Sequence, residues 1–590
     1  MRLLDELKRR NVFRAAVLYA GAVWAFGQGL SQFSPAIGLP DWTTRGFLIA
    51  AGIGFPFWIA FAWFYEFTPN GLKRESEIVP EDSIARSTGR KLDFWIIGIL
   101  AIVVVLLLTD RFLAHDKPAA PPIAERSIAV LPFANEGGDS DQQYFSDGLS
   151  EDFTNALSQF SGLKVIGRHS AFQFRDSTDS AQKIGAKLGV AHLLEGSVRH
   201  AGDTVRISAR LINTSDGSMV WSERYDRPYK NLFALQDEIT RAIASALQAK
   251  LLESGSAVVQ SDRPPGGDLE AYTAYLQGKF YNTRGTEADL RLAVAQHELA
   301  IKIDRRYAQA WAALGHMWTS LGVAFLSGQE AQEAYRTARA AANTALLIDP
   351  NLAAGHVARG YVMLVADFDW AGAQAEYQLA EQLAPNDPVS SFYLGSALAT
   401  WGQLERAVEL SRVALANDPL HVNWYHWLAA YLAGQGRLDE AAAASQKAVE
   451  LQPAAVSYHS RLSAIEIQRG NADAAMTAAQ AEPVDGGFHE IALTLALQIG
   501  PDPAAAKAAL DQLIATQAEV APFQIAEAYA LRRDPDEMFA WLERAWATRD
   551  GGMQSLLYNP FILRYQHDPR FALFCEKVGL PDVTEGKAMP

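Results

Sequence analysis

A proline recurs at nearly constant spacing in the second half of this 590-residue chain. Four such prolines are separated by 35, 34 and 34 residues: Pro350, Pro385, Pro419 and Pro453. A period of this length is typical of repeated helical hairpins, in which the proline ends the second helix of a unit. Small residues recur at fixed offsets before the last two prolines, as a close helix crossing requires: Gly395, Ala407, Ala414 and Ala429, Ala441, Ala448. The spacing predicts an α-solenoid.

The pattern resembles the tetratricopeptide repeat, most closely over residues 352–453. We expect the solenoid over residues 268–552, followed by a C-terminal cap and tail over 553–590. Stacked hairpins curve into a superhelix whose concave face binds peptides or proteins. The expected binding residues are helix positions that face away from the partner helix: Val389, Phe392, Ser396, Asn423, His426 and Ala430.

Three long uncharged runs lie before residue 115, at about 15–33, 46–65 and 93–113. Each approaches the roughly 20 residues that span a bilayer, so we expect three transmembrane helices in a membrane module over residues 1–114. The open alternatives are a cleaved signal peptide for the first run and a buried core helix for the third. Lys and Arg residues before the first and third runs predict a cytoplasmic N-terminus. This topology predicts a multi-pass membrane protein that contacts the lipid bilayer and has extracytoplasmic C-terminal domains. With the resemblance described below, it implies the bacterial inner membrane and periplasmic C-terminal domains.

A proline-rich linker over residues 115–124 precedes a small α/β domain with a mixed sheet, expected over residues 125–252, and a second linker over 253–267. The apolar patterning predicts strands at 127–133, 163–166, 192–199, 204–213 and 218–225. It predicts helices at 145–160, 180–188 and 232–252. Asp147 and Glu151 lie near an expected helix start, where carboxylates face the helix dipole favourably, so we interpret them as capping residues.

Several separated blocks of this domain, SIAVLPF, QQYFSDGLSEDFTNALSQFSGLKVIGRHSAFQF, LGVAHLLEGSVRHAGDTVRISARLINTSDGSMVWSERYDR and FALQDEIT, follow one another in a known order. In these blocks the chain resembles the TolB amino-terminal-like (FlgO/CsgG-type) domain, and the N-terminal runs resemble the membrane segments that accompany it in bacteria. The resemblance implies an envelope protein whose domain contacts other proteins, with no catalytic residues to transfer. Relatives often carry a cytoplasmic winged-helix or cyclase domain. None is expected here, because about a dozen residues precede the first run.

The charge balance and the motif content argue against several classes of function. Lys plus Arg number 52 against 67 Asp plus Glu, a formal charge of −15, which disfavours binding to nucleic acid. The single cysteine, Cys575, cannot form an intrachain disulfide, and the histidines lack metal-ligand spacing. We therefore expect no cofactor, no metal and no enzymatic activity.

Two functions remain open. The first is a non-catalytic, inner-membrane-anchored scaffold or sensor that presents the α/β domain and the repeats to envelope partners. The alternative is a signalling subunit that regulates a separate cytoplasmic effector such as a cyclase or transcription factor. The sequence leaves the oligomeric state undetermined.

Overall fold

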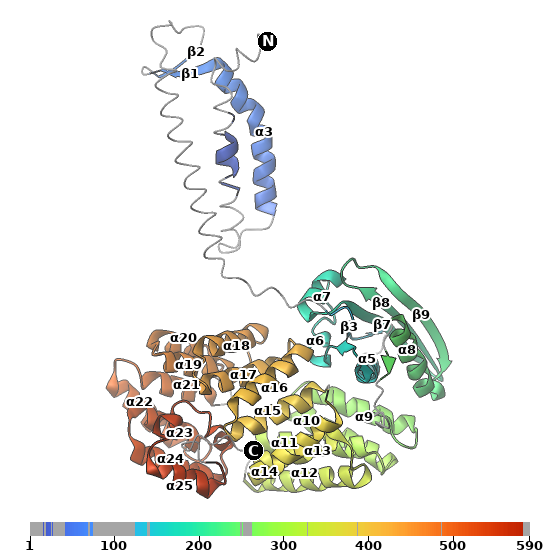
Figure 1. Cartoon of the computed structure of the whole chain (residues 1–590), viewed down its shortest axis with the longest axis vertical. Coiled ribbons are helices and arrows are strands. Elements are labelled where there is room, and N and C mark those ends of the chain that lie inside the picture. Colours follow the sequence, from blue (N-terminus) through green and yellow to red (C-terminus); the bar gives the residue numbers. More distant parts are fainter. Residues whose placement is uncertain are drawn as a thin grey trace. The chain divides into compact units, whose positions relative to one another are not determined.

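The computed structural model describes residues 16, 19–24, 26–27, 42–68, 71–74, 124–137, 142–247, 250–251, 262–326, 328–385, 387–484 and 487–581. The chain divides into two compact units, Met1–Pro122 and Ile123–Pro590, which are described separately. Both are drawn in Figure 1.

The described part of the first unit contains one long helix and a hairpin. Helix α3 (Trp42–Phe64) leads directly into strand β1 (Tyr65–Thr68), which pairs antiparallel with β2 (Gly71–Arg74). The Tyr19 hydroxyl donates a hydrogen bond to the carbonyl oxygen of Ala51 in α3 at 2.8 Å.

The prediction of three transmembrane helices is wrong for the part of the chain that can be examined. Among the described residues, no helix combines the length and the apolar character needed to cross a membrane. Helix α3 overlaps the predicted span 46–65, but that prediction rested only on the absence of charged residues. The run at 93–113 and most of 15–33 lie outside the described residues. The inner-membrane location and the periplasmic placement rested on these spans and are corrected with them.

The second unit begins with a six-stranded mixed sheet and its helices. Its strands are β3 (Ser127–Val130), β4 (Ala134–Asn135), β6 (Lys164–Val165), β7 (His192–Ala201), β8 (Thr204–Asn213) and β9 (Met219–Pro228). Its helices are α5 (Gln143–Ser158), α6 (Arg168–Phe172), α7 (Ala181–Leu188) and α8 (Leu232–Ala246). A short pair, β5 (Phe160–Ser161) and β10 (Lys250–Leu251), lies apart from the sheet.

The strand order is β6-β3-β7-β8-β9, with β4 pairing to β7. Strand β3 runs parallel to β6 and β7, whereas β7, β8 and β9 form an antiparallel meander. The glycines at the two meander turns, Gly202 and Gly217, have φ of +56° and +74°, a conformation that side chains with a Cβ rarely adopt. The predicted turns therefore carry the residues that their backbone requires.

Alternation along the strands directs apolar side chains to both faces of the sheet. Leu194 and Ile207 pack on one face with α5 and α8, whereas Leu193 packs on the other with α6 and α7. The first of these cores continues into the repeat helices through buried Tyr272 and Tyr275. The α/β part and the start of the solenoid therefore share one hydrophobic core.

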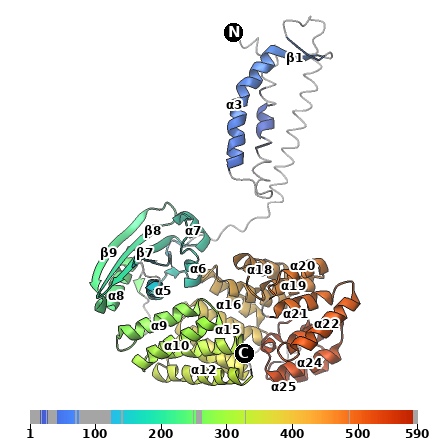
Figure 2. The same ribbon diagram turned by 180° about the vertical axis from the view of Figure 1, so that it is seen from behind.

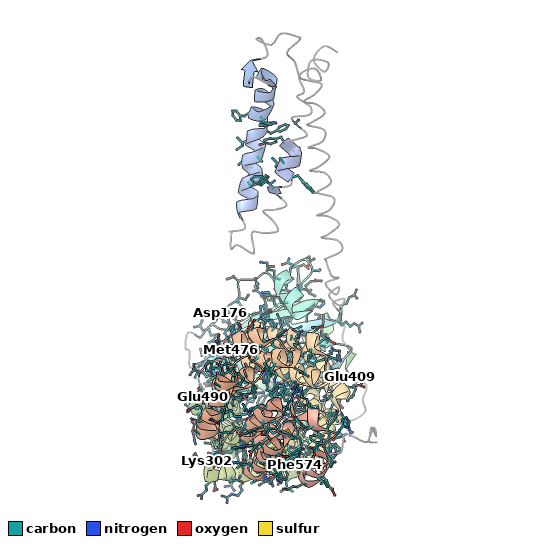
Figure 3. All side chains as sticks on the ribbon, turned by 90° about the vertical axis from the view of Figure 1, so that its left-hand side faces the viewer. Asp176, Lys302, Glu409, Met476, Glu490 and Phe574 are labelled. Carbon is teal, nitrogen blue, oxygen red and sulfur yellow. The ribbon has the colours of Figure 1, made fainter. Side chains whose placement is uncertain are left out.

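The helical repeats predicted from the proline spacing are confirmed. Each of the four recurring prolines lies two residues beyond the last residue of a second helix, as Pro419 does after Asn417. The hairpins are α9 (Leu269–Asn282) with α10 (Glu287–Ile303), α11 (Ala308–Ala324) with α12 (Gly328–Ile348), α13 (Ala353–Val362) with α14 (Trp370–Leu383), α15 (Pro388–Thr400) with α16 (Leu404–Asn417), α17 (Val422–Gly434) with α18 (Leu438–Leu451), α19 (Tyr458–Arg469) with α20 (Ala472–Ala481), α21 (Phe488–Leu497) with α22 (Pro503–Gln517), and α23 (Pro522–Arg532) with α24 (Pro535–Thr548). Side chains of these helices fill the space between successive hairpins (Figure 3).

The first helices of the hairpins form the inner layer of the solenoid. From α11 through α23, each first helix contacts the first helix of the next hairpin, whereas the second helices pack mainly on their own hairpin and its neighbour's first helix. In a superhelix the layer of smaller radius holds the more closely spaced helices. The candidate binding face is therefore carried by α11, α13, α15, α17 and α19.

The C-terminal end of the chain folds back onto the middle of the solenoid. The Trp370 indole at the start of α14 donates a hydrogen bond to the carbonyl oxygen of Val578 in α25 (Pro569–Val578) at 2.9 Å. Phe368, with φ of +55° after a π-helical turn, stacks on Trp370 and lies 5.6 Å from the ring of Trp546. The left-handed backbone at a phenylalanine is unfavourable, and this packing compensates for it.

Candidate protein-binding surface

The structure divides the six predicted binding residues into exposed and covered positions. Val389 is 41% exposed, Asn423 is exposed and Ser396 is half-buried. Phe392, His426 and Ala430 are buried, at 7%, 6% and 2% exposure. The two sets of three therefore do not form one open surface.

Ala430 is covered by the chain's own C-terminal segment. It lines an enclosed cavity of about 20 Å³ together with Tyr558, Asn559 and Phe561. A cavity of this size holds one or two water molecules. The Tyr558 ring also meets Tyr431 of α17 edge-on, with 5.4 Å between centroids. Periodicity placed Ala430 on the inner face correctly, but only the tertiary fold shows that residues 555–561 occupy that part of the face.

A row of aromatic rings runs along the inner layer from the α/β part to α11. Successive ring centroids lie 4.3, 3.8, 5.5, 5.7, 5.6 and 5.2 Å apart along His169, His421, Trp424, Phe392, Tyr393, Tyr361 and His316. Phe392 and Trp424 are buried between repeats, whereas the three rings at the far end are half-buried. None of these three residues is among the six predicted binding residues. Tyr361 lies 35 residues before the predicted binding residue Ser396, the same interval that separates Pro350 from Pro385. The repeat period could therefore have identified Tyr361 as an inner-face residue.

The rings at the half-buried end of this row are uncharged near neutral pH and partly accessible. Burial lowers the pKa of His316 to about 4 and raises the pKa of Tyr361 to about 12. Both rings nevertheless keep accessible surface. Burial thus keeps both side chains in their neutral forms, while part of each ring remains accessible. We define His316, Tyr361 and Tyr393 as the inner aromatic site.

An ionic cluster joins the α/β part to the first repeat. Lys279 of α9 lies 2.8 Å from the Glu151 carboxylate of α5 and 2.9 Å from the Asp262 carboxylate, and the Arg168 side chain lies 3.2 Å from Glu151. Burial opposes the charged form of Lys279, but Asp262 and Glu151 outweigh it and hold its pKa well above the usual value. Burial likewise opposes ionisation of Glu151, yet Lys279 and Arg168 keep its pKa lowered.

The interpretation of Asp147 and Glu151 as helix caps is therefore wrong. Helix α5 begins after Gln142, which makes no capping hydrogen bond with its side chain. Asp147 instead pairs with Arg175 at 2.7 Å, and Glu151 belongs to the ionic cluster. Their partners lie far away in sequence, so a local pattern gave no sign of them.

A second contact joins α6 to the turn between α16 and α17. The amide and the hydroxyl of Ser170 both donate hydrogen bonds to the Asp418 carboxylate, the amide at 2.7 Å. The Leu420 amide donates to the Ser170 hydroxyl at 2.7 Å, and the Gly167 amide donates to the carbonyl oxygen of Asn417 at 2.7 Å. Burial raises the pKa of Asp418 to about 6. The α/β part is thus fixed at two places more than a hundred residues apart in the repeats.

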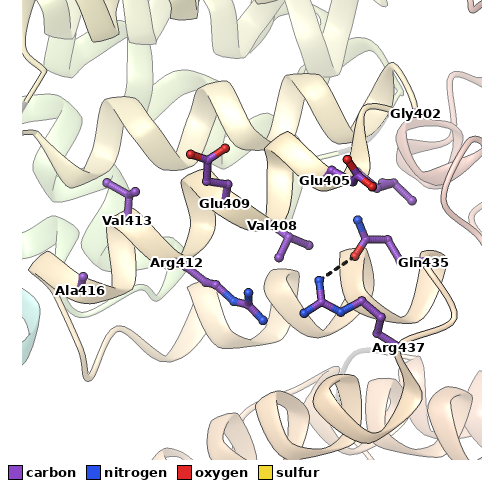
Figure 4. A pocket seen from close by; sticks show the side chains of 10 residues that line it. Gly402, Glu405, Val408, Glu409, Arg412, Val413, Ala416, Gln435 and Arg437 are labelled. Atoms are coloured by element: carbon purple, nitrogen blue, oxygen red, sulfur yellow. Dashed lines mark hydrogen bonds between the residues drawn. The ribbon is translucent and has the colours of Figure 1, made fainter. Parts of the chain in front are cut away.

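A hollow lies on the other side of the repeats, lined by α16 and by the turn between α17 and α18 (Figure 4). Its volume is about 870 Å³, and its walls carry both signs of charge, including Glu405, Glu409, Arg412 and Arg437. Glu440 lies 2.7 Å from both Arg412 and Arg437 and so links the two helices. None of the predicted binding residues lines this hollow.

Two further features bear on chemistry. Among the described residues, no group of three or more His, Cys, Asp or Glu side chains is arranged to hold a metal ion. Cys575 is buried in the same hydrophobic core as Phe571 and Phe574.

Comparison with solved structures returns helical-repeat proteins of low similarity. PilW, a type IV pilus biogenesis factor, is 24% identical, covering 36% of this chain and 94% of its own, with a TM-score of 0.29. Yeast Tom70 is 14% identical, covering 52% and 67%, with a TM-score of 0.32. The assignment of repeats rests on the helices α9–α24 themselves.

Comparison with known sequences returns one curated relative and one family model. A protein of Rhizobium meliloti (strain 1021) named putative adenylate cyclase 3 is 48% identical over 139 residues, which is 24% of either chain. The match thus spans about a quarter of that relative's length. The resemblance to the TolB amino-terminal-like (FlgO/CsgG-type) domain is not borne out by these comparisons. Residues 124–242 instead match the model of the second domain of HilA/YgeH-like transcriptional regulators.

Proposed function

We propose that this chain is a non-catalytic scaffold whose inner repeat helices bind a partner polypeptide. The observation that carries the proposal is the inner aromatic site, where half-buried rings from three successive first helices lie together with centroids 5.2 and 5.6 Å apart. Aromatic rings of this kind provide large contact area at low entropic cost, and solenoids bind extended partners along their inner face.

The α/β part orients this surface and supplies a second one. Its ionic cluster with α9 and its hydrogen bonds to Asp418 hold it against the repeats at two separate places. A domain fixed in this manner presents its own exposed sheet in a constant orientation relative to the inner aromatic site.

A second candidate is a signalling subunit that regulates a separate effector, such as a cyclase or transcription factor. It is favoured by the names of two matches: a putative adenylate cyclase that is similar over 139 residues, and the family of transcriptional regulators whose second-domain model matches residues 124–242. The TolB amino-terminal-like assignment of this part belongs to the same proposal, since it also describes a domain that contacts other proteins.

Site-specific photocrosslinking tests the scaffold function. A photoreactive phenylalanine analogue replaces Tyr361 in the inner aromatic site or, as the matched control, Leu379 on the second helix α14, which is 39% exposed. We expect a discrete crosslinked protein from position 361 that is lost when H316A is added, and none from position 379. Equal crosslinking at both positions, or no product at 361, contradicts the proposal. An adenylate cyclase or transcription factor as the product supports the signalling role.

A further inference from the structure

Strand β9 is an unpaired edge of the mixed sheet. It lies at the end of the strand order, beyond β8, and no other described strand pairs with it. Figures 1 and 2 show it at the outer margin of the α/β part from opposite sides. Ten residues with most side chains exposed form a long edge, and such an edge is a template for pairing with another strand.

The hydrogen bonds between β8 and β9 determine which backbone groups of β9 point outward. The Tyr229 amide donates to the Asp203 carbonyl oxygen at 2.7 Å, one step beyond the opposed pair Thr204 and Pro228. Opposed residues of an antiparallel ladder alternate between hydrogen-bonded and non-hydrogen-bonded pairs. The backbone groups that point away from β8 therefore belong to Ser222, Arg224, Asp226 and Pro228, the last of which offers only its carbonyl oxygen.

The charges along this edge are self-complementary in one antiparallel register. When Arg224 of one copy lies opposite Asp226 of a second copy, Glu223 lies opposite Arg227 and Tyr225 lies opposite itself on the two-fold axis. Every charged pair then joins opposite signs, which stabilises cross-strand pairs. The outward amides and carbonyls of Arg224 and Asp226 also face each other in this register.

The neighbouring registers are disfavoured. The next register in either direction that keeps the outward groups aligned brings Arg224 opposite Arg224 or Asp226 opposite Asp226, and like charges directly opposite are destabilising. Shifts by an odd number place outward groups against inward ones and exchange the faces of the strand. The edge therefore specifies one alignment.

The charged groups on this edge are available to a second copy. The Asp226 side chain is 58% exposed although it accepts a hydrogen bond from Arg206 at 2.6 Å, and the Arg227 side chain is 42% exposed beside Glu238. Met219, at the beginning of β9, is 62% exposed and adds apolar surface.

We propose that two copies of this chain dimerise by antiparallel pairing of their β9 edges in the register that aligns Arg224 with Asp226. The two sheets then continue as one across the two-fold axis. The paired area is small compared with that of permanent dimers, so the dimer forms reversibly with rising concentration. The inference concerns self-association and stands independently of the partner-binding function proposed above.

Sedimentation velocity of the full chain over a range of concentrations tests the dimer. We expect the wild type to dimerise and R224E to weaken dimerisation by about tenfold or more, because both symmetry-related pairs become repulsive. The charge-matched control R305E alters an exposed arginine without an ion-pair partner among the described residues, in the turn before α11, and should behave as wild type. Circular dichroism checks that each variant keeps its fold.

A mixing experiment tests the register itself. R224E and D226R should each be monomeric alone, whereas an equimolar mixture of the two should dimerise. In the mixed dimer the introduced carboxylate faces the introduced guanidinium, and the native Asp226 of one copy faces the native Arg224 of the other. A wild type that stays monomeric, a dimer that R224E leaves unchanged, or a mixture that fails to dimerise overturns the proposal.

Discussion

Replacing Lys279 with methionine should open the contact between α5 and α9. The substitution keeps the length of the apolar stem but removes the charge that lies 2.8 Å from Glu151 and 2.9 Å from Asp262. Removing one partner of a buried ion pair costs about 3–5 kcal/mol because it leaves an uncompensated charge. Arg168 still lies 3.2 Å from Glu151 and partly compensates its charge. The side chains of Lys279, Glu151 and Asp262 also keep 14–21% exposure. We therefore expect the free energy of unfolding to fall by about 3 kcal/mol, at the lower end of this range.

A double-mutant cycle separates the ion pair from other effects of the substitution. The free energy of urea unfolding is measured for K279M, E151Q and the double variant, and hydrogen exchange of α5 and α9 reports local opening, with α23 as the internal reference. The double variant should lose less than the sum of the single losses, by about 1 kcal/mol or more, because it carries fewer orphaned charges. K507M removes an exposed pair with Asp511 and should cost about 0.5 kcal/mol or less. Additive losses, or a K279M cost below about 1 kcal/mol, would refute the reasoning.

Three further predictions concern the second contact and the C-terminal fold. The folded-state pKa of Asp418, about 6 against an ordinary value of 3.8, means that the folded chain binds the proton more tightly. Stability should therefore fall as the pH rises from about 4 to 6, and D418N should flatten this slope in thermal unfolding curves measured across that range. G434A places a methyl group 2.7 Å from the carbonyl oxygen of Tyr558, so urea unfolding should show a loss of about 1–2 kcal/mol, and an unchanged midpoint would contradict the packing. W370F keeps an aromatic ring but removes the hydrogen bond to Val578, so thermal unfolding should reveal a cost of about 1 kcal/mol, which would be absent if α25 did not dock there.

Local patterns in the sequence were sufficient for the repeats and for most elements of the α/β part. The helix predicted at 145–160 is found as Gln143–Ser158, and the strand predicted at 204–213 is found as Thr204–Asn213. These predictions succeeded because helical and strand periodicities are imposed by the backbone within a few residues. The strand predicted at 127–133 ends earlier, at Val130, where its pairing with β7 stops.

The transmembrane prediction failed because it treated the absence of charge as equivalent to apolar character. Helix α3 does form across the predicted second span, so the length of the element was predictable. A helix must be both long enough and apolar enough to cross a bilayer, and a count of uncharged residues measures neither property fully.

The sequence by itself determined the period of the solenoid, because prolines and small residues at 34-residue offsets act on the nearest turns and helix crossings. Only the tertiary structure decided which inner positions remain accessible. Ala430 and His426 have the periodicity of groove residues, yet they are buried, and Ala430 is covered by the segment around Tyr558. Glu151 and Lys279, or Ser170 and Asp418, become partners only when the chain brings together residues more than a hundred positions apart. Such contacts depend on how many successive hairpins are arranged in space, and a local sequence pattern does not determine that arrangement.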